Sequence, residues 1–309
     1  MASSATNLPI ADGPGSASAA PHLPNGFSDT FTSRYIDTGD VRLHAVIGGD
    51  GPPLLLIHGW PGSWYYWRLV MPALAQDFEV IAVDQRGIGL SDKPEAGYDT
   101  ATLANDLVGL MDALGHERFA VTGHDRGSYV AYRTALDHPD RVSKLVVMDS
   151  VPAVEALERC GAEFAAAWWH WWFFAQQEKP AERVICADPD TWYEAWTKNS
   201  PQALGPENHA DFLAAIRNPA TVHAMLEDYR AGLTIDRHND EVDRAAGRRI
   251  ECPTLALWST DDDMEQLYGD VVDVWRPWCR EVDGYGIKST HHIAERNPQD
   301  LVRALRTFL

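Results

Sequence analysis

The sequence predicts an α/β fold in which a mostly parallel sheet of eight strands carries an inserted helical cap. Three observations lead to this prediction. A chain of 309 residues is long enough for one large domain with an insertion. From Phe31 onward, short β-rich runs alternate with amphipathic stretches, as in βαβ units. The alternation stops near Pro152 and resumes near residue 250, which indicates an insertion between the two parts.

The first part of the chain is expected to form strands separated by helices. Each helix ends near glycine, aspartate or a His-Pro pair, which are common stop signals. The expected strands are Phe31–Asp37, Val41–Ile47, Pro53–His58, Phe78–Val83, Phe119–Thr122 and Lys144–Met148. The expected helices are Trp64–Leu74, Ala101–Leu114 and Gly127–Asp137.

Residues 152–249 show no convincing β run and are interpreted as the helical cap. Its clearest helical blocks are aromatic, at Ala165–Gln177 and Asp190–Trp196. The chain then returns to a strand at Thr254–Ser259, a less defined one around Arg280–Ile287, and a closing helix at Asn297–Leu309. The α/β core is therefore expected to comprise residues 29–151 and 250–309.

The remaining residues, 1–28, are rich in Ala, Ser, Gly and Pro and are expected to form a disordered tail without the features of a signal peptide. A net charge of −19 argues against nucleic acid and anionic membranes as partners. The four cysteines show no C-x-x-C spacing, so neither a zinc site nor a disulfide framework is indicated. A cytoplasmic location is expected, with a small molecule as the partner.

The strongest functional signal is the segment from Val121 to Ser128, VTGHDRGS, in which a strand is followed by Gly-x-Asp-x-Gly and a helix. This is the form of a nucleophile elbow, where flanking glycines allow a tight turn that exposes the central side chain. The central residue here is Asp125 rather than serine. An aspartate is ionised near neutral pH and can attack an sp³ carbon directly, which forms an ester on the enzyme.

Hydrolysis of such an ester requires a histidine that deprotonates water. His291 lies in the loop before the last helix, where this base is expected, and is preferred over His292. Upstream, the glycine-rich HGWPG segment ends another strand. Its Trp60 N–H, together with the N–H of Arg126, is expected to form an oxyanion hole.

Seven segments together resemble a known family. They are HGWPG at His58–Gly62, DQRGIGLSD at Asp84–Asp92, GHDRGS at Gly123–Ser128, ALDHPDRV at Ala135–Val142, WHWWFFAQ at Trp169–Gln176, EDYRAGLTID at Glu227–Asp236 and VWRPW at Val274–Trp278. The chain from Phe31 to Leu309 resembles the α/β-hydrolases that include haloacetate and fluoroacetate dehalogenases. It is more distantly similar to soluble epoxide hydrolases and haloalkane dehalogenases. The combination is more specific for the family than for the substrate.

The resemblance implies an α/β-hydrolase fold with Asp125 as nucleophile, His291 as base and Asp149 as the acid of the triad. A competing position for the acid follows the next strand, at the run Asp261–Asp263. Arg126 matches an arginine that holds the substrate carboxylate, a task that suits its planar fork of donors. The resemblance further implies that the departing halide is bound by three cap residues, His170, Trp171 and Tyr229.

One position departs from the haloacetate enzymes, which carry a second carboxylate-binding arginine where this chain has Tyr129. A tyrosine can donate a hydrogen bond there but offers no charge. The other aromatic residues of the cap block, Trp168, Trp172, Phe173 and Phe174, are interpreted as packing, as are Trp258, Trp275 and Trp278.

The function expected from these residues is hydrolytic dehalogenation of short 2-haloacids such as haloacetate or fluoroacetate, without metal or organic cofactor. An epoxide hydrolase would use the same Asp125 and His291, with cap tyrosines such as Tyr229 and Tyr193 as acids. A third alternative is a non-catalytic protein that uses the fold to bind a ligand. The analogy also suggests a homodimer.

Overall fold

The computed structural model describes residues 8–196 and 200–309, and its centre is a sheet of eight strands. The strand order is β1-β2-β4-β3-β5-β6-β7-β8; β2 pairs antiparallel with β1 and β4, and every other pair is parallel. All eight predicted strands are confirmed. They are β1 (Phe31–Asp37), β2 (Arg42–Gly48), β3 (Pro53–Ile57), β4 (Glu79–Asp84), β5 (Phe119–His124), β6 (Val142–Met148), β7 (Thr254–Ser259) and β8 (Val282–Ile287).

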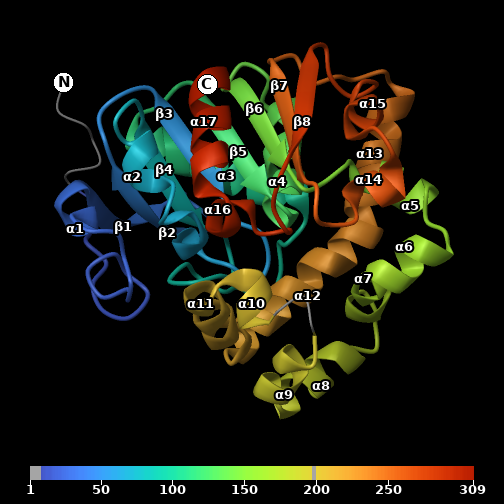
Figure 1. Ribbon diagram of the computed structural model, residues 1–309, viewed down its shortest axis with the longest axis horizontal. Helices are drawn as coiled ribbons and strands as arrows, with labels where there is room; N and C mark the ends of the chain where they lie inside the picture. The colour runs from blue at the N-terminus through green and yellow to red at the C-terminus, as the bar shows by residue number, and fades with distance from the viewer. Residues whose placement is uncertain (1–7, 197–199) are drawn as a thin grey trace.

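Helices cover the sheet, and its central strands β3, β4 and β5 are almost wholly buried, which explains their continuous apolar runs. Asp99 caps α3 by accepting from the N–H of Thr102, and the helix ends at Gly115, whose φ is 85°. In Figure 1, the closing helix α17 crosses the sheet near the C-terminus. The helices of the core are α1 (Phe27–Thr30), α2 (Met71–Leu74), α3 (Thr100–Leu114), α4 (Arg126–Asp137), α14 (Met264–Tyr268), α15 (Val271–Trp275), α16 (Ile293–Arg296) and α17 (Pro298–Phe308), with a 3₁₀ turn η2 (Trp64–Trp67).

Two predicted helices are broken in the structure. The block Trp64–Leu74 forms η2 and the short α2, because Ser63 caps the 3₁₀ turn and Pro72 near the start of α2 cannot donate to a preceding turn. The block Ala165–Gln177 is interrupted at Trp168, whose ψ of 35° is not helical.

The helical cap stands between β6 and β7 in the chain and lies below the sheet in Figure 1, over the ends of the parallel strands. Among the described residues, no helix combines the length and apolar character needed to cross a membrane. The cap helices are α5 (Ala153–Glu158), α6 (Ala162–Ala167), α7 (Trp169–Phe174), α8 (Pro180–Ala187), α9 (Pro189–Glu194), α10 (Pro201–Leu204), α11 (Pro206–Ile216), α12 (Pro219–Leu233) and α13 (Ile235–Ala245).

The N-terminal segment differs from the disordered tail predicted for residues 1–28. Residues 1–7 lie outside the described part, but residues 8–26 pack on the core. The carbonyl of Gly15 accepts from Trp64 Nε1 at 2.8 Å, and that of Pro21 accepts from the Tyr65 hydroxyl at 2.7 Å. Ala17 is buried in the core and Leu8 and Leu23 pack against it, so the segment is anchored both by apolar side chains and by its carbonyl groups.

Candidate active site

The nucleophile elbow has the backbone geometry that its sequence predicts. Asp125 follows β5 and precedes α4, with φ at 52° and ψ at −123°, a conformation that L-residues rarely adopt. A Cβ on Gly123 would lie 2.3 Å from the carbonyl oxygen of Gly127, and one on Gly127 would lie 2.4 Å from that of Ile57. The two glycines therefore allow the close approaches that hold the aspartate above the sheet.

The carboxylate of Asp125 is held by the donors expected for an oxyanion hole. Its Oδ1 accepts from the N–H of Trp60 at 2.9 Å, and the N–H of Arg126 also donates to it. Burial alone would raise the pKa of Asp125, but the hydrogen bond and charge of His291 outweigh burial and hold it well below its ordinary range. The group is thus an ionised carboxylate at neutral pH.

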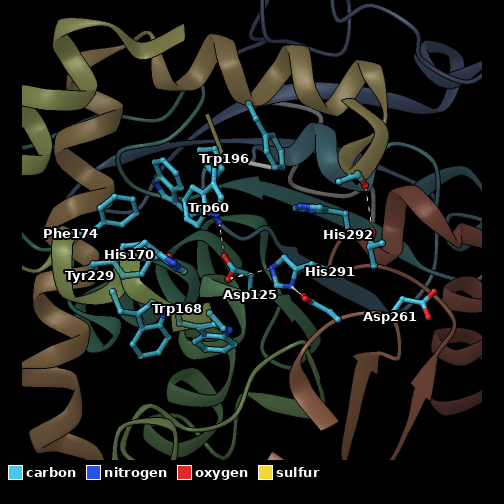
Figure 2. A pocket seen from close by; sticks show the side chains of 17 residues that line it. Trp60, Asp125, Trp168, His170, Phe174, Trp196, Tyr229, Asp261, His291 and His292 are labelled. Carbon is cyan, nitrogen blue, oxygen red and sulfur yellow. Dashed lines mark hydrogen bonds and ion pairs between the residues drawn. The ribbon is translucent and has the colours of Figure 1, made fainter. Parts of the chain in front are cut away.

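His291 stands beside this carboxylate, with its Nε2 3.6 Å from Oδ2 of Asp125 (Figure 2). On the other side of the ring, Nδ1 lies 3.5 Å from Asp149 and 3.4 Å from Asp262. Burial lowers the pKa of His291, but the surrounding carboxylates, first of all Asp125, raise it well above its ordinary value. The free site therefore holds an imidazolium among carboxylates.

Both positions considered for the triad acid contribute a carboxylate. Asp149 follows β6, is fully buried, and accepts from the N–H and the hydroxyl of Ser259, each at 2.6 Å. In the acidic run after β7, the middle residue, Asp262, lies beside His291. Asp261 pairs with the exposed Lys288, and Asp263 accepts from Trp168 Nε1 at 3.0 Å.

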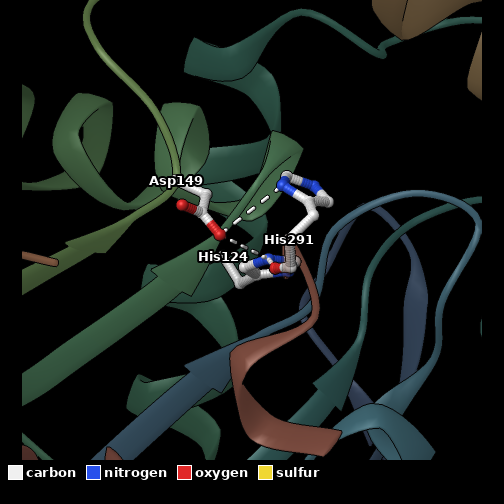
Figure 3. A group of neighbouring side chains, drawn as sticks. All are labelled: His124, Asp149 and His291. Atoms are coloured by element: carbon white, nitrogen blue, oxygen red, sulfur yellow. Dashed lines mark hydrogen bonds and ion pairs between the residues drawn. The ribbon is translucent and has the colours of Figure 1, made fainter. Parts of the chain in front are cut away.

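His124 is a member of this network that the sequence did not single out. Its Nε2 donates to the backbone carbonyl of His291 at 2.8 Å and lies 3.8 Å from Asp149 (Figure 3). Its ring stacks on Tyr66 with centroids 4.6 Å apart. The ligand atoms of His124, Asp149 and His291 lie within 4.8 Å of one another, as in metal sites. However, a protonated Nε2 cannot ligate a metal, so these residues fit a hydrogen-bonded network better.

Asp125 and His291 open onto a cavity of about 240 Å³ between the core and the cap. Each predicted halide-binding residue lines it: His170 and Trp171 from α7, and Tyr229 from α12 (Figure 2). Burial raises the pKa of Tyr229 well above its ordinary value, so its phenol remains a hydrogen-bond donor at neutral pH. The cavity therefore places three residues with N–H or O–H groups around one carboxylate.

The apolar wall of the cavity was largely missed from the sequence. Trp168 and Phe174, interpreted as packing, line the cavity, and Trp196 and Phe212 contribute further rings. Trp172 is 36% exposed rather than packed inside. An aromatic block predicts an apolar surface, but helical spacing does not reveal which rings face a cavity. The predictions for Trp258, Trp275 and Trp278 are confirmed, since all three are buried.

Arg126 lies outside the lining of this cavity. Its Nε donates to Asp228 at 2.7 Å and its Nη2 at 2.8 Å, a bidentate pair with a residue of α12. Its guanidinium packs over the rings of Tyr129, at 4.6 Å, and Tyr229, at 4.8 Å. Among the described residues, neither Arg126 Nη1 nor the Tyr129 hydroxyl has a hydrogen-bond partner, although both are buried.

The second tyrosine considered for epoxide opening is also outside the cavity lining. Tyr193 is buried, with its ring 5.6 Å from that of His209. Its hydroxyl has no hydrogen-bond partner among the described residues. Of the two tyrosines, only Tyr229 lines the cavity that contains Asp125.

Comparisons with known proteins agree with this geometry. A family model described as the alpha/beta hydrolase fold matches residues 52–294. The chain is 39% identical over 288 residues to a fluoroacetate dehalogenase of a Burkholderia species, covering 90% of this chain and 94% of the relative. It is 32% identical over 275 residues to a soluble epoxide hydrolase of Corynebacterium sp. (strain C12), covering 86% and 93%. Among solved structures, the epoxide hydrolase CorEH matches with a TM-score of 0.82 at 30% identity, over 90% of this chain and 98% of that one.

Proposed function

This chain belongs to the α/β-hydrolase fold family, and we propose that it is a hydrolytic dehalogenase of short 2-haloacids such as fluoroacetate and chloroacetate. One observation carries the proposal. The cavity that contains the Asp125 carboxylate is lined by His170, Trp171 and Tyr229, three residues that can donate hydrogen bonds to a departing halide. Fluoride is a poor leaving group, so several donors in a site shielded from water are what its displacement needs.

In the first step, a carboxylate oxygen of Asp125 attacks the carbon that bears the halogen. A C–O bond forms as the C–halogen bond breaks, and the halide leaves with the bonding electrons toward the three donors. The result is an ester between Asp125 and the acid. The depressed pKa of Asp125 keeps this nucleophile ionised at neutral pH.

In the second step, water attacks the ester carbonyl of Asp125 and His291 Nε2 takes a proton from the water. The N–H groups of Trp60 and Arg126 stabilise the oxyanion that forms. The ester C–O bond then breaks, and the leaving alkoxide takes the proton held by His291 and departs as the 2-hydroxyacid. The second proton of the water is lost from the Asp125 carboxyl to solvent, which restores the carboxylate. Asp149, fixed by Ser259, orients His291 and stabilises its positive charge.

In the proposed complex, Arg126 and Tyr129 bind the substrate carboxylate. Asp228 engages Nε and Nη2 of Arg126, so Nη1 is the donor left for a carboxylate, with the Tyr129 hydroxyl as the other buried donor nearby. Neither residue lines the cavity that contains Asp125.

Epoxide hydrolysis is the second candidate, favoured by the similarity to epoxide hydrolases. It would use the same aspartate and histidine, with Tyr229 protonating the ring oxygen as it opens. The position of Tyr193 outside the cavity lining leaves this reaction with one of the two tyrosines considered for it. The three donors His170, Trp171 and Tyr229 therefore suit a departing halide better than an epoxide oxygen.

The decisive experiment uses His291→Ala, because loss of the base should trap the ester on Asp125. Intact mass would be measured after incubation with fluoroacetate, chloroacetate, a 2-halopropionate and an aryl epoxide in parallel. An adduct from a haloacid, absent from the Asp125→Asn/His291→Ala double variant, is expected. An adduct from the epoxide alone would replace the proposal by epoxide hydrolysis, and binding without any adduct would favour a non-catalytic ligand-binding protein.

A further inference from the structure

We infer that Asp262 is a second acid for His291, so that two carboxylates from different strand ends hold the histidine and stabilise its positive charge. This inference rests on the proposed role of His291 as the base in ester hydrolysis. Asp262 is a positioning residue in this scheme, since it acts on the ester through the imidazole and does not itself touch the reacting atoms.

The two acids lie at nearly the same distance from one nitrogen of His291. Nδ1 of His291 lies 3.4 Å from Oδ2 of Asp262 and 3.5 Å from Oδ2 of Asp149. Asp149 follows β6 and Asp262 follows β7, and these strands are neighbours in the parallel sheet. A single N–H can be shared between two acceptors on the same side of the ring, so the arrangement does not force a choice between them.

The two carboxylates differ in how they are held. Asp149 is fully buried and accepts two hydrogen bonds from Ser259, which fix it to β7. Asp262 is 13% exposed and lines the cavity. Its loop is pinned by its neighbours, because the N–H of Asp261 donates to the carbonyl of Ser289 at 3.0 Å and Asp263 accepts from Trp168 of the cap. Asp262 is thus kept in place from both the His291 loop and the cap.

A second acid matters most in the ester intermediate, where it raises the pKa of His291 after Asp125 has lost its charge. The ionisable groups that face His291 are Asp125, Asp149, Asp262, His124 and His292. Once Asp125 is esterified it carries no charge, but two carboxylates still stabilise the imidazolium. Ester hydrolysis requires neutral His291, so its rate should rise only as the pH passes the still elevated pKa of the histidine in the ester.

The test follows decay of the ester against pH in wild type, Asp262→Asn, Asp149→Asn and the double variant, using rapid quench and intact mass. The rate of ester decay should increase with pH as His291 loses its proton, and this increase is called the rising limb. In Asp262→Asn the pKa of His291 should be lower, because one nearby carboxylate is lost, so the rising limb should lie about one pH unit lower than in wild type. Each single variant should keep turnover within roughly a hundredfold of wild type, while the double variant should lose on the order of ten-thousandfold, as when a triad histidine has no orienting acid.

Asp261→Asn is the matched control, since it makes the same change one residue away on a carboxylate that pairs with Lys288 and points away from His291 in Figure 2. Its rising limb should coincide with that of wild type. Asp262→Glu, which keeps the charge, should restore the limb and thereby separate a charge effect from damage to the loop. The inference is overturned if Asp262→Asn has the wild-type limb, or if Asp149→Asn alone loses as much activity as the double variant.

Failure of the proposed function would look different. The pH dependence of ester decay can be measured with any substrate that forms the ester, including an aryl epoxide. The test of Asp262 therefore does not depend on which substrate the enzyme uses. If only the epoxide esterifies Asp125, the dehalogenase proposal falls while the role of Asp262 is still decided by the position of the limb.

Discussion

The Nη1 of Arg126 and the hydroxyl of Tyr129 are buried donors that have no acceptor among the described residues. A buried donor without a partner lowers stability by about 1–3 kcal/mol relative to a satisfied one. Their presence side by side, at the position where the resemblance to haloacetate dehalogenases predicts a carboxylate site, gives each residue a functional interpretation that can be tested separately from folding.

Tyr129→Phe tests this interpretation. The substitution removes an unpaired hydroxyl and keeps the ring under Arg126, so the free energy of unfolding should stay the same or rise slightly. If the hydroxyl binds the substrate carboxylate, KM for chloroacetate should increase about tenfold, as for loss of one hydrogen bond to a charged group. Steady-state kinetics and urea unfolding measure the two effects. An unchanged KM would remove Tyr129 from the carboxylate site.

Tyr229→Phe addresses the leaving group. Fluoride accepts hydrogen bonds more strongly than bromide does, so loss of the phenol should slow fluoride release by roughly ten- to a hundredfold and bromide release by less. The measurement is the initial rate of halide release from fluoroacetate and bromoacetate. Equal losses for both halides would show that the phenol does not contact the leaving group.

At the scale of helices, charged contacts join the cap to the core. Arg133 of α4 donates to Asp240 at 3.0 Å and to Asp243 at 2.5 Å, both on α13, and all three side chains are buried. Arg126 and Asp228 make a similar link between α4 and α12. The helix that begins at the nucleophile is thus the one to which two cap helices are attached.

Arg133→Met should destabilise the protein by about 3–5 kcal/mol, because it removes the cation that pairs with the buried Asp240 and one of the two that pair with Asp243. Urea unfolding at neutral pH measures the change. Arg276→Met is the control, since Arg276 pairs with Asp273 on the surface and should change stability by less than about 1 kcal/mol. Similar losses in both variants would contradict a special role for the buried contact.

Contacts of this kind, between segments far apart in the chain, could not be predicted from the sequence. The strands, α3 and α4 could be predicted because their patterns are local: apolar runs, a capping Asp99 and a terminal Gly115. The elbow was predictable for the same reason. The contact between Arg126 and Asp228, and the approach of Asp262 to His291, depend on segments far apart in the chain. No local pattern encodes them, and the sequence therefore favours Asp149 as the acid without excluding the run Asp261–Asp263.

At the scale of the whole molecule, acids of the cap make stability depend on pH. Burial raises the pKa of Asp211 and Asp236 to about 7 and that of Asp240 to about 6. In the unfolded chain these carboxyls ionise near their ordinary pKa of about 4. Between about pH 4 and pH 7 the folded state binds more protons than the unfolded state, so the free energy of unfolding falls as pH rises through this range.

Asp236→Asn isolates one of these contributions. The amide oxygen can still accept from the N–H and hydroxyl of Thr100, but the group no longer ionises. The variant should lose less stability than wild type between pH 5 and pH 8, by up to about 1.4 kcal/mol per pH unit of the affected range. Urea unfolding at the two pH values provides the comparison. Parallel losses would mean that Asp236 does not contribute to the pH dependence.

The positive φ of Asp125 implies a conflict between what natural selection keeps and what folding favours. Glycine adopts that conformation without strain, and strained torsions of this kind destabilise a protein by about 1–3 kcal/mol each. A lineage that no longer needed the ester chemistry could relieve this strain by a mutation to glycine at this one codon, at the loss of the acceptor for the N–H groups of Trp60 and Arg126. Aspartate retained at this position among descendants of this protein would therefore indicate that its carboxylate is still used. Glycine there would indicate a protein that has lost the ester chemistry but still folds.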